Sequence, residues 1–298
     1  MGDVLAGFHT VWEFDTDSVL IRFERGIRTP KLFQVLGERR VPFEALSAVE
    51  LAPGKKGTVI LRAVPRPGAD PLMDAAGGQL KDGCDPYRLV LPVERETLAE
   101  TYADAIRAAL PADAAEPTER HLVTAPTPPI TFKAYDGKAS FDGESVAFRW
   151  FWTGASSAKW KAGDQSFTIG ELAGIEWRSP EVLGGHLRLV RRGADGAARP
   201  GEADQDPAAV VFGLGYGLVH ESLPFAAAVL EAVQASEPDP DALPTGCLPV
   251  PARTAEPQAR PDPADIADRI RHLGALHEAG LLTEDEFSHK KAELLAEL

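Results

Sequence analysis

The chain has 298 residues, 44% of them hydrophobic, and a formal net charge of −14 at pH 7. This length allows two domains of ordinary size, and the lack of an apolar run of 18 residues argues against a transmembrane helix. Residues 1–11 lack the basic and then apolar order of a secretory signal, and the two distant cysteines do not make a disulfide framework. We therefore expect a cytoplasmic protein. Its acidic balance argues against nucleic-acid binding but leaves room for a local basic patch that docks at a membrane.

The first part of the chain, residues 1–112, is predicted to be a small β domain. Its hairpin pairs residues 9–14 with 18–25, and places Ile21 and Phe23 on one face. Further short strands are expected at residues 38–43, 46–52, 58–64 and 87–93.

Two other segments complete this domain. Residues 65–86, rich in Gly, Pro, Asp and Ala, are expected to form a long mobile loop. Thr97 and Glu100 have the spacing of a capping box, which predicts a closing helix that ends before Pro111.

Residues 130–236 repeat this pattern. The string Phe14-Asp15 followed by a strand with an arginine recurs as Phe141-Asp142, at an offset of 127 residues. The offset changes only where loops are expected, which indicates a true duplication because loops tolerate insertions and strand pairing does not. Ser222 is expected to cap the second closing helix. Four of the five tryptophans lie in this copy.

Two proline-rich segments follow the copies. Residues 113–129 are predicted to be the inter-domain linker, and residues 237–263, with eight prolines, a disordered linker. Residues 264–298 then predict a helical hairpin too small to hold a sufficient core alone. Its apolar positions are the predicted oligomerisation contacts: Ile270, Leu273, Leu276, Phe287, Leu294 and Leu295.

The tail resembles the SHOCT (short C-terminal) domain. The matching residues are Leu273-x-x-Leu276, then Gly280-Leu281-Leu282-Thr283-x-x-Glu286-Phe287, then Lys290-Lys291 and Leu294-Leu295. Leu282 stands where isoleucine is commoner. The resemblance implies an interaction or oligomerisation module without a cofactor.

The duplicated region resembles an uncharacterised bacterial domain of pleckstrin-homology-like type, found in tandem and often ahead of a SHOCT tail. The residues that carry this resemblance are the two Phe-Asp turns, Val41-Pro42-Phe43-x-x-Leu46, its counterpart Phe167-Thr168-Ile169-x-x-Leu172, and the closing helices. It implies a mainly β fold with α: two strand barrels, each closed by a C-terminal helix. It implies no settled function and transfers no functional residues.

A basic patch is the first candidate site. Its members are Arg22, Arg25, Arg28, Lys31, Arg39 and Arg40. Such cations can hold an anionic head group or partner, or can simply be solvated charges that protect a strand edge from aggregation. The second copy matches Arg22 with Arg149 but does not repeat the rest of the patch, so such a site would not be duplicated.

Aromatic residues of the second copy are the other candidates. Phe148, Trp150 and Trp152 are expected to alternate onto one buried strand face. Phe151, on the opposite face, and Trp160, in a loop, are the candidate exposed contacts.

The remaining patterns carry little chemistry. The string from Gly213 to Gly217 lacks the Lys-Ser/Thr ending of a phosphate loop and predicts a glycine-rich strand end or bulge. His272 and His277 are five residues apart, which misses the spacing for a shared metal on a helix. No nucleophile elbow is visible, so we expect neither catalytic residues nor a cofactor or metal.

These patterns lead to two hypotheses. The first is a non-enzymatic binding or scaffold protein whose tandem modules recognise a protein, peptide or head group, while the tail assembles copies into a homo-oligomer. The alternative is recruitment to an anionic membrane surface through the basic patch between Arg22 and Arg40.

Overall fold

The computed structural model describes residues 3–193 and 202–236. Both copies belong to one compact unit, Met1–Pro240. The predicted linker 237–263 and the predicted hairpin 264–298, with its six oligomerisation residues, lie outside the described residues.

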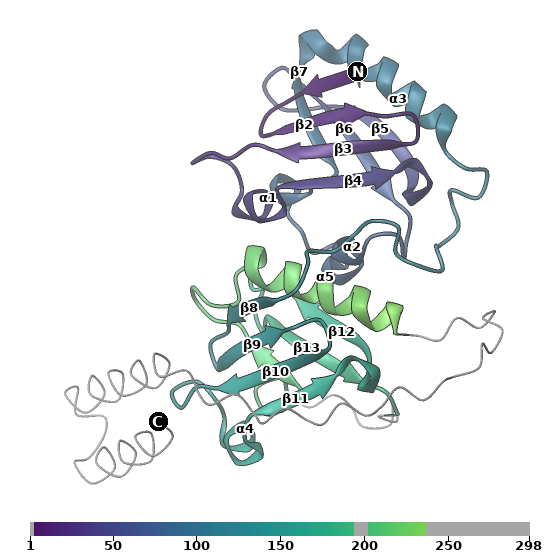
Figure 1. Ribbon diagram of the computed structural model, residues 1–298. Helices are drawn as coiled ribbons and strands as arrows, with labels where there is room; N and C mark the ends of the chain where they lie inside the picture. Colours follow the sequence, from purple (N-terminus) through teal and green to yellow (C-terminus); the bar gives the residue numbers. More distant parts are fainter. Residues whose placement is uncertain (1–2, 194–201, 237–298) are drawn as a thin grey trace, which may run out of the picture. The chain divides into compact units, whose positions relative to one another are not determined.

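The first copy consists of two small antiparallel sheets and a closing helix (Figure 1). One sheet has the order β1-β2-β3-β4, with strands β1 (Asp3–Ala6), β2 (Thr10–Phe14), β3 (Ser18–Phe23) and β4 (Glu38–Pro42). The other has the order β5-β6-β7, with strands β5 (Leu46–Pro53), β6 (Thr58–Pro65) and β7 (Arg88–Pro92). Helix α3 (Glu96–Ala109) follows.

The second copy repeats this plan. Its first sheet contains β8 (Ile130–Lys133), β9 (Gly137–Phe141), β10 (Ser145–Trp150) and β11 (Gln165–Thr168). Its second sheet contains β12 (Leu172–Arg178), β13 (His186–Arg191) and β14 (Ala209–Val211), and α5 (Val219–Ala235) follows. The register shift at Leu46/Ala48 in β5 recurs at Leu172/Gly174 in β12. Because a bulge sets the local bend of a strand, this shared position supports the duplication that the sequence predicts.

The predicted hairpins are confirmed. In β3, Ile21 and Phe23 are buried and Arg22 is exposed, as the alternation indicates. The core of each copy lies between its two sheets and its closing helix.

Three local predictions are wrong. The capping box at Thr97 is absent, because α3 already begins at Glu96 and has no side-chain cap. Ser222 does not cap α5, which begins at Val219; instead its buried hydroxyl accepts a hydrogen bond from Trp177 Nε1, 3.0 Å away. Residues 65–86 do not form one long loop, because they contain α2 (Pro71–Ala76).

Helix α2 has regular end signals. The Asp70 carboxylate accepts a hydrogen bond from Leu72 N at 2.9 Å, Pro71 occupies the first turn, and Gly77 ends the helix in the left-handed conformation. A second unpredicted short helix, α1 (Lys31–Leu36), connects β3 to β4, and α4 (Ser157–Ala162) is its counterpart in the second copy.

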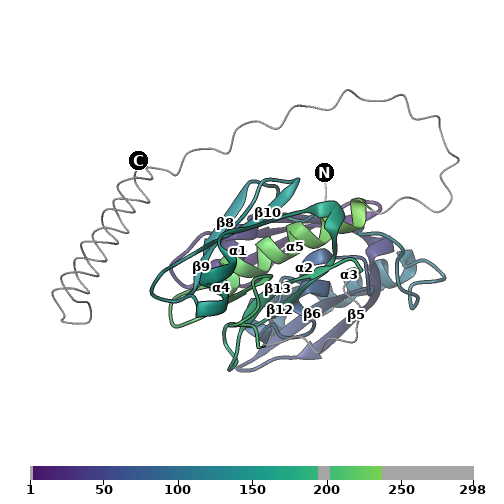
Figure 2. The ribbon, with the colours of Figure 1, turned by 90° about the horizontal axis from the view of Figure 1, so that it is seen from below.

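The two copies share packing between α1, α2 and α5 (Figure 2). The first copy's Leu32, Leu72, Ala75 and Ala76 belong to the same buried cluster as the core of the second copy. The hydrophobic core therefore continues from one copy into the other.

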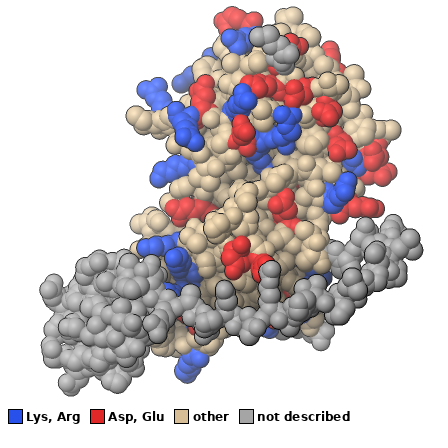
Figure 3. Space-filling model, viewed as in Figure 1, with Lys and Arg blue, Asp and Glu red and all other residues tan. Residues whose placement is uncertain are grey.

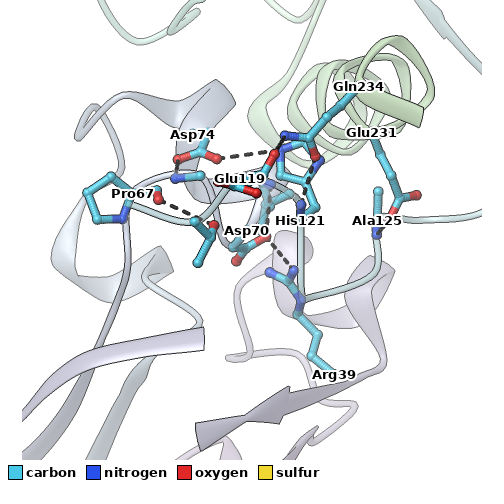
Figure 4. Close-up of polar contacts among 12 residues, drawn as sticks. Arg39, Pro67, Asp70, Asp74, Glu119, His121, Ala125, Glu231 and Gln234 are labelled. Carbon is cyan, nitrogen blue, oxygen red and sulfur yellow. Dashed lines mark hydrogen bonds and ion pairs between the residues drawn. The ribbon is translucent and has the colours of Figure 1, made fainter. Parts of the chain in front are cut away.

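The segment 113–129, which was predicted to be a linker, is held by hydrogen bonds on two sides (Figure 4). Leu122 N and Val123 N donate to Ala69 O, at 2.8 and 3.0 Å. On the other side, Gln234 of α5 accepts from His121 N at 2.7 Å, and Glu231 accepts from Ala125 N at 3.1 Å.

Candidate functional site: a groove between the two copies

A groove of about 550 Å³ lies where the two copies meet, and we call it the inter-copy groove. The first copy contributes Pro30, Lys31, Leu32, Leu80, Lys81 and Cys84. The second contributes residues 180–185, residues 212–215, Leu218, Val219 and His220. The groove therefore needs both copies, and neither copy alone could form it.

Polar contacts between the copies fix the walls of this groove. The Gln79 side chain donates to Trp177 O at 3.0 Å and accepts from Ser179 N at 2.9 Å. Lys81 Nζ lies 2.7 Å from Glu181 Oε1. The turn that begins at residue 179 is thus attached directly to the first copy.

Leu183 projects from that turn and is 94% exposed. The turn is closed by hydrogen bonds from Val182 N to Ser179 O and from Gly185 N to Val182 O. A Cβ at Gly185 would lie 2.5 Å from Ser179 O, so the close approach of the two backbone segments requires glycine. The hydrogen-bonded turn therefore keeps the Leu183 side chain exposed to water in a fixed position.

Leu214 is also fully exposed, on a neighbouring turn that Phe212 N joins to Gly185 O at 2.9 Å. The string from Gly213 to Gly217 forms a tight turn after β14, in which Tyr216 N donates to Gly213 O at 3.0 Å. Gly215 and Gly217 have positive φ angles. The glycine-rich string is thus the end of a strand, as predicted, and its turn presents Leu214.

Two titratable groups in the groove, His220 and Cys84, favour their neutral forms. Burial lowers the pKa of His220, and the imidazole is therefore uncharged at neutral pH. Burial likewise raises the pKa of the Cys84 thiol, which opposes formation of a reactive thiolate. Among the described residues, no group of three or more His, Cys, Asp or Glu is placed to hold a metal ion.

The predicted basic patch does not form one cationic surface. Arg22 pairs with Glu13 and Glu38, and Arg40 pairs with Asp15. Arg39 is buried, and its Nη2 lies 2.7 Å from Asp70 Oδ1, an ion pair shown in Figure 4.

The Arg39–Asp70 pair belongs to a buried structural network. Tyr87 donates its hydroxyl to the other oxygen of Asp70 at 2.7 Å, and burial raises the pKa of Tyr87. The three remaining members of the predicted patch, Arg25, Arg28 and Lys31, are exposed.

The candidate aromatic residues also divide. Phe148 and Trp150 are buried as predicted, but Trp152 is 47% exposed because β10 ends at Trp150 and the chain turns. Trp160 is exposed as predicted, but it lies in helix α4 and not in a loop, because Ser156 caps that helix. Trp152 and Trp160 lie edge to face on the surface, with ring centroids 5.2 Å apart. Phe151 is partly exposed.

Sequence reasoning did not single out Leu183 and Leu214. Leu214 stands between two glycines and Leu183 precedes two, which is a local signal for a turn, but the groove that they border depends on the packing of the copies.

The fold defines a protein built from two copies of one β module that share a core. In a comparison with protein-family models, the model described as Domain of unknown function (DUF4429) matches residues 12–107 and 139–230, and the Short C-terminal domain matches residues 268–295. The chain therefore belongs to the DUF4429 family and carries a C-terminal SHOCT domain. No curated protein matches the chain.

Proposed function

We propose that each copy is a pleckstrin-homology-like barrel and that the chain is a non-enzymatic protein-binding scaffold. The barrel is supported by links between the two sheets of each copy. Phe8 N donates to Val90 O of β7 at 2.8 Å, and Tyr135 N donates to Val211 O of β14 at 2.9 Å. At the other edge of each copy only a short 3-10 turn separates β4 from β5, or β11 from β12.

The observation that carries the binding role is the pair of exposed leucines, Leu183 and Leu214, at the rims of the inter-copy groove. Burying one leucine side chain contributes about 1.5–3 kcal/mol. A partner that covers both would gain several kcal/mol, because both turns are already ordered and little entropy is lost on binding.

The charges around the groove indicate the chemistry of this partner. Lys81 is already paired with Glu181, whereas Lys31 on the first-copy side is exposed. We therefore infer that the groove binds an apolar segment of a partner protein that also carries a carboxylate near Lys31.

Selection from a random peptide display library on the full chain tests this role. We expect enriched peptides to carry adjacent apolar residues and to bind the Leu183→Asp/Leu214→Asp variant at least about a hundredfold more weakly, as the loss of two buried leucines implies. The matched control is Val93→Asp/Leu98→Asp, which changes two exposed apolar residues of the first copy outside the groove. Equal binding to wild type and to the groove variant would contradict the proposal.

The SHOCT domain suggests the second part of the scaffold. Its match and the apolar spacing of Ile270, Leu273 and Leu276 support assembly into a homo-oligomer. Light scattering should then give a multimer for the full chain and a monomer for residues 1–263. A multimer for both would instead assign assembly to the two copies.

A further inference from the structure

The loop between β3 and α1, residues 24–30, holds Ile27 fully exposed to water. The loop protrudes from the first copy at the left of Figure 1. An exposed isoleucine on a poorly ordered loop would mean little, since single apolar residues are common on surfaces. This loop, however, is extensively braced.

Hydrogen bonds from both sides fix the loop. Thr29 N donates to Gly26 O at 3.1 Å, and the Gln34 amide donates to both Gly26 O and Thr29 O at 3.0 Å. Glu24 N donates to His9 O at 2.9 Å, which attaches the loop to the turn that carries the half-exposed Phe8. These hydrogen bonds therefore fix the loop in the conformation that exposes Ile27.

Three cations surround this apolar tip. Arg25, Arg28 and Lys31 are exposed, and within residues 3–193 and 202–236 none of them makes an ion pair, whereas Arg22 and Arg40 of the neighbouring strands are neutralised by carboxylates. Figure 3 shows Lys and Arg side chains gathered along the edge where the loop protrudes. The tip thus combines an apolar point with unpaired positive charge.

We propose that this loop docks on an anionic lipid surface, with Ile27 entering the boundary between head groups and acyl chains. Arg25 and Arg28 would lie against lipid phosphates, as basic residues do beside an inserted apolar residue. A convex tip with one apolar residue and flanking cations suits a flat anionic surface, whereas an apolar protein segment suits the concave inter-copy groove. The inference does not depend on the groove.

Each basic residue near an anionic bilayer strengthens partitioning about fivefold, and salt weakens the effect. Three cations on one chain give weak, reversible binding, which assembly of several chains would strengthen.

Sedimentation of the full chain with vesicles tests the proposal. Vesicles of phosphatidylglycerol and phosphatidylcholine in equal parts should retain the wild-type chain at low salt, and pure phosphatidylcholine should not. The Arg25→Gln/Arg28→Gln variant should bind about 25-fold more weakly. The control Lys55→Gln/Lys56→Gln removes two exposed charges from the turn between β5 and β6 and should bind like wild type. Equal loss in both variants, or no retention of the wild type, would overturn the proposal.

A fluorescent label separates insertion from simple charge attraction. In a Cys84→Ser/Cys247→Ser background, an environment-sensitive dye on Ile27→Cys should shift to the blue with anionic vesicles, whereas the same dye on Lys56→Cys should not. No shift at position 27 would refute the insertion. Lys31 is left unchanged because it also lines the groove, so failure here and failure of peptide binding remain distinguishable.

Discussion

At the scale of single residues, Lys159 shows how the two copies use one position differently. Its ammonium group is buried, forms an ion pair with Asp136 and lies 4.9 Å from the ring centroid of Trp150. By the offsets of the neighbouring strands, Phe33 and Phe23 take the places of Lys159 and Trp150 in the first copy, and they stack with centroids 4.6 Å apart. Burial lowers the pKa of Lys159 and raises that of Asp136.

Removal of one partner should therefore cost more than removal of both. Lys159→Met leaves a buried carboxylate without its cation, and we expect the free energy of unfolding to fall by about 3–5 kcal/mol. Adding Asp136→Asn should recover much of this loss, because the amide oxygen can still accept the hydrogen bond from Val211 N. Urea denaturation measures both values, and a double variant no more stable than the single one would contradict this account.

Asp142 supplies a prediction of pH dependence. Burial raises the pKa of this carboxyl, but hydrogen bonds from Ser145 N, Glu144 N and the Ser145 hydroxyl outweigh it, so the pKa lies below the ordinary 3.8. A depressed folded-state pKa gives stability that is present above pH 3.8 and is lost as the pH falls through the folded value. Asp142→Ala should cost about 1 kcal/mol at pH 7, allowing for solvent exposure.

Urea titrations of wild type and Asp142→Ala between neutral and strongly acid pH check this prediction. The difference in the free energy of unfolding should shrink only below about pH 3.8. A difference that is constant over the whole range would show that the carboxylate's charge plays no part.

At the scale of elements, α2 joins the copies. Leu72 is fully buried and belongs to the cluster formed mainly by the second copy. We expect Leu72→Ala to lower the free energy of unfolding by about 2–5 kcal/mol because it leaves a cavity at this junction. Urea denaturation followed by tryptophan fluorescence measures the loss, and Leu98→Ala on the exposed side of α3 is the control, with a change within about 0.5 kcal/mol. A loss no larger than that of the control would contradict the role of α2.

The sequence predicts the hairpins well because strand alternation is a local property, as Ile21 and Phe23 show. It predicts the helix starts poorly. Ser222 has a hydroxyl that could cap a helix, but this hydroxyl accepts a hydrogen bond from Trp177 Nε1. That contact joins distant segments, and residue spacing cannot reveal it. For α2 the local signals were present, since Asp70-Pro71 and Gly77 mark its two ends, but the surrounding glycines and prolines favoured a loop.

The candidate site was less predictable than the fold. Arg39 was predicted to be a surface cation. It is buried instead, and its guanidinium pairs with Asp70, which lies 31 residues away in the chain. Leu183 and Leu214 come from two neighbouring turns of the second copy, which Phe212 N joins to Gly185 O, and they border a groove whose other wall is the first copy, held there by Gln79 and Lys81. Long-range packing of this kind leaves no periodic pattern in the sequence.

At the scale of the whole molecule, the account depends on the two copies acting as one body. Within the described residues no helix has both the length and the apolar character to cross a bilayer. The inter-copy groove exists only while the copies stay joined.

Hydrogen-exchange mass spectrometry of the full chain in rising urea tests this most directly, because it follows each copy without any substitution. We predict that peptides covering β6 in the first copy and β13 in the second lose protection at the same urea concentration, as one cooperative unit. Loss of protection in one copy while the other stays protected would show that the copies are independent, and would contradict the inter-copy groove as a stable binding site.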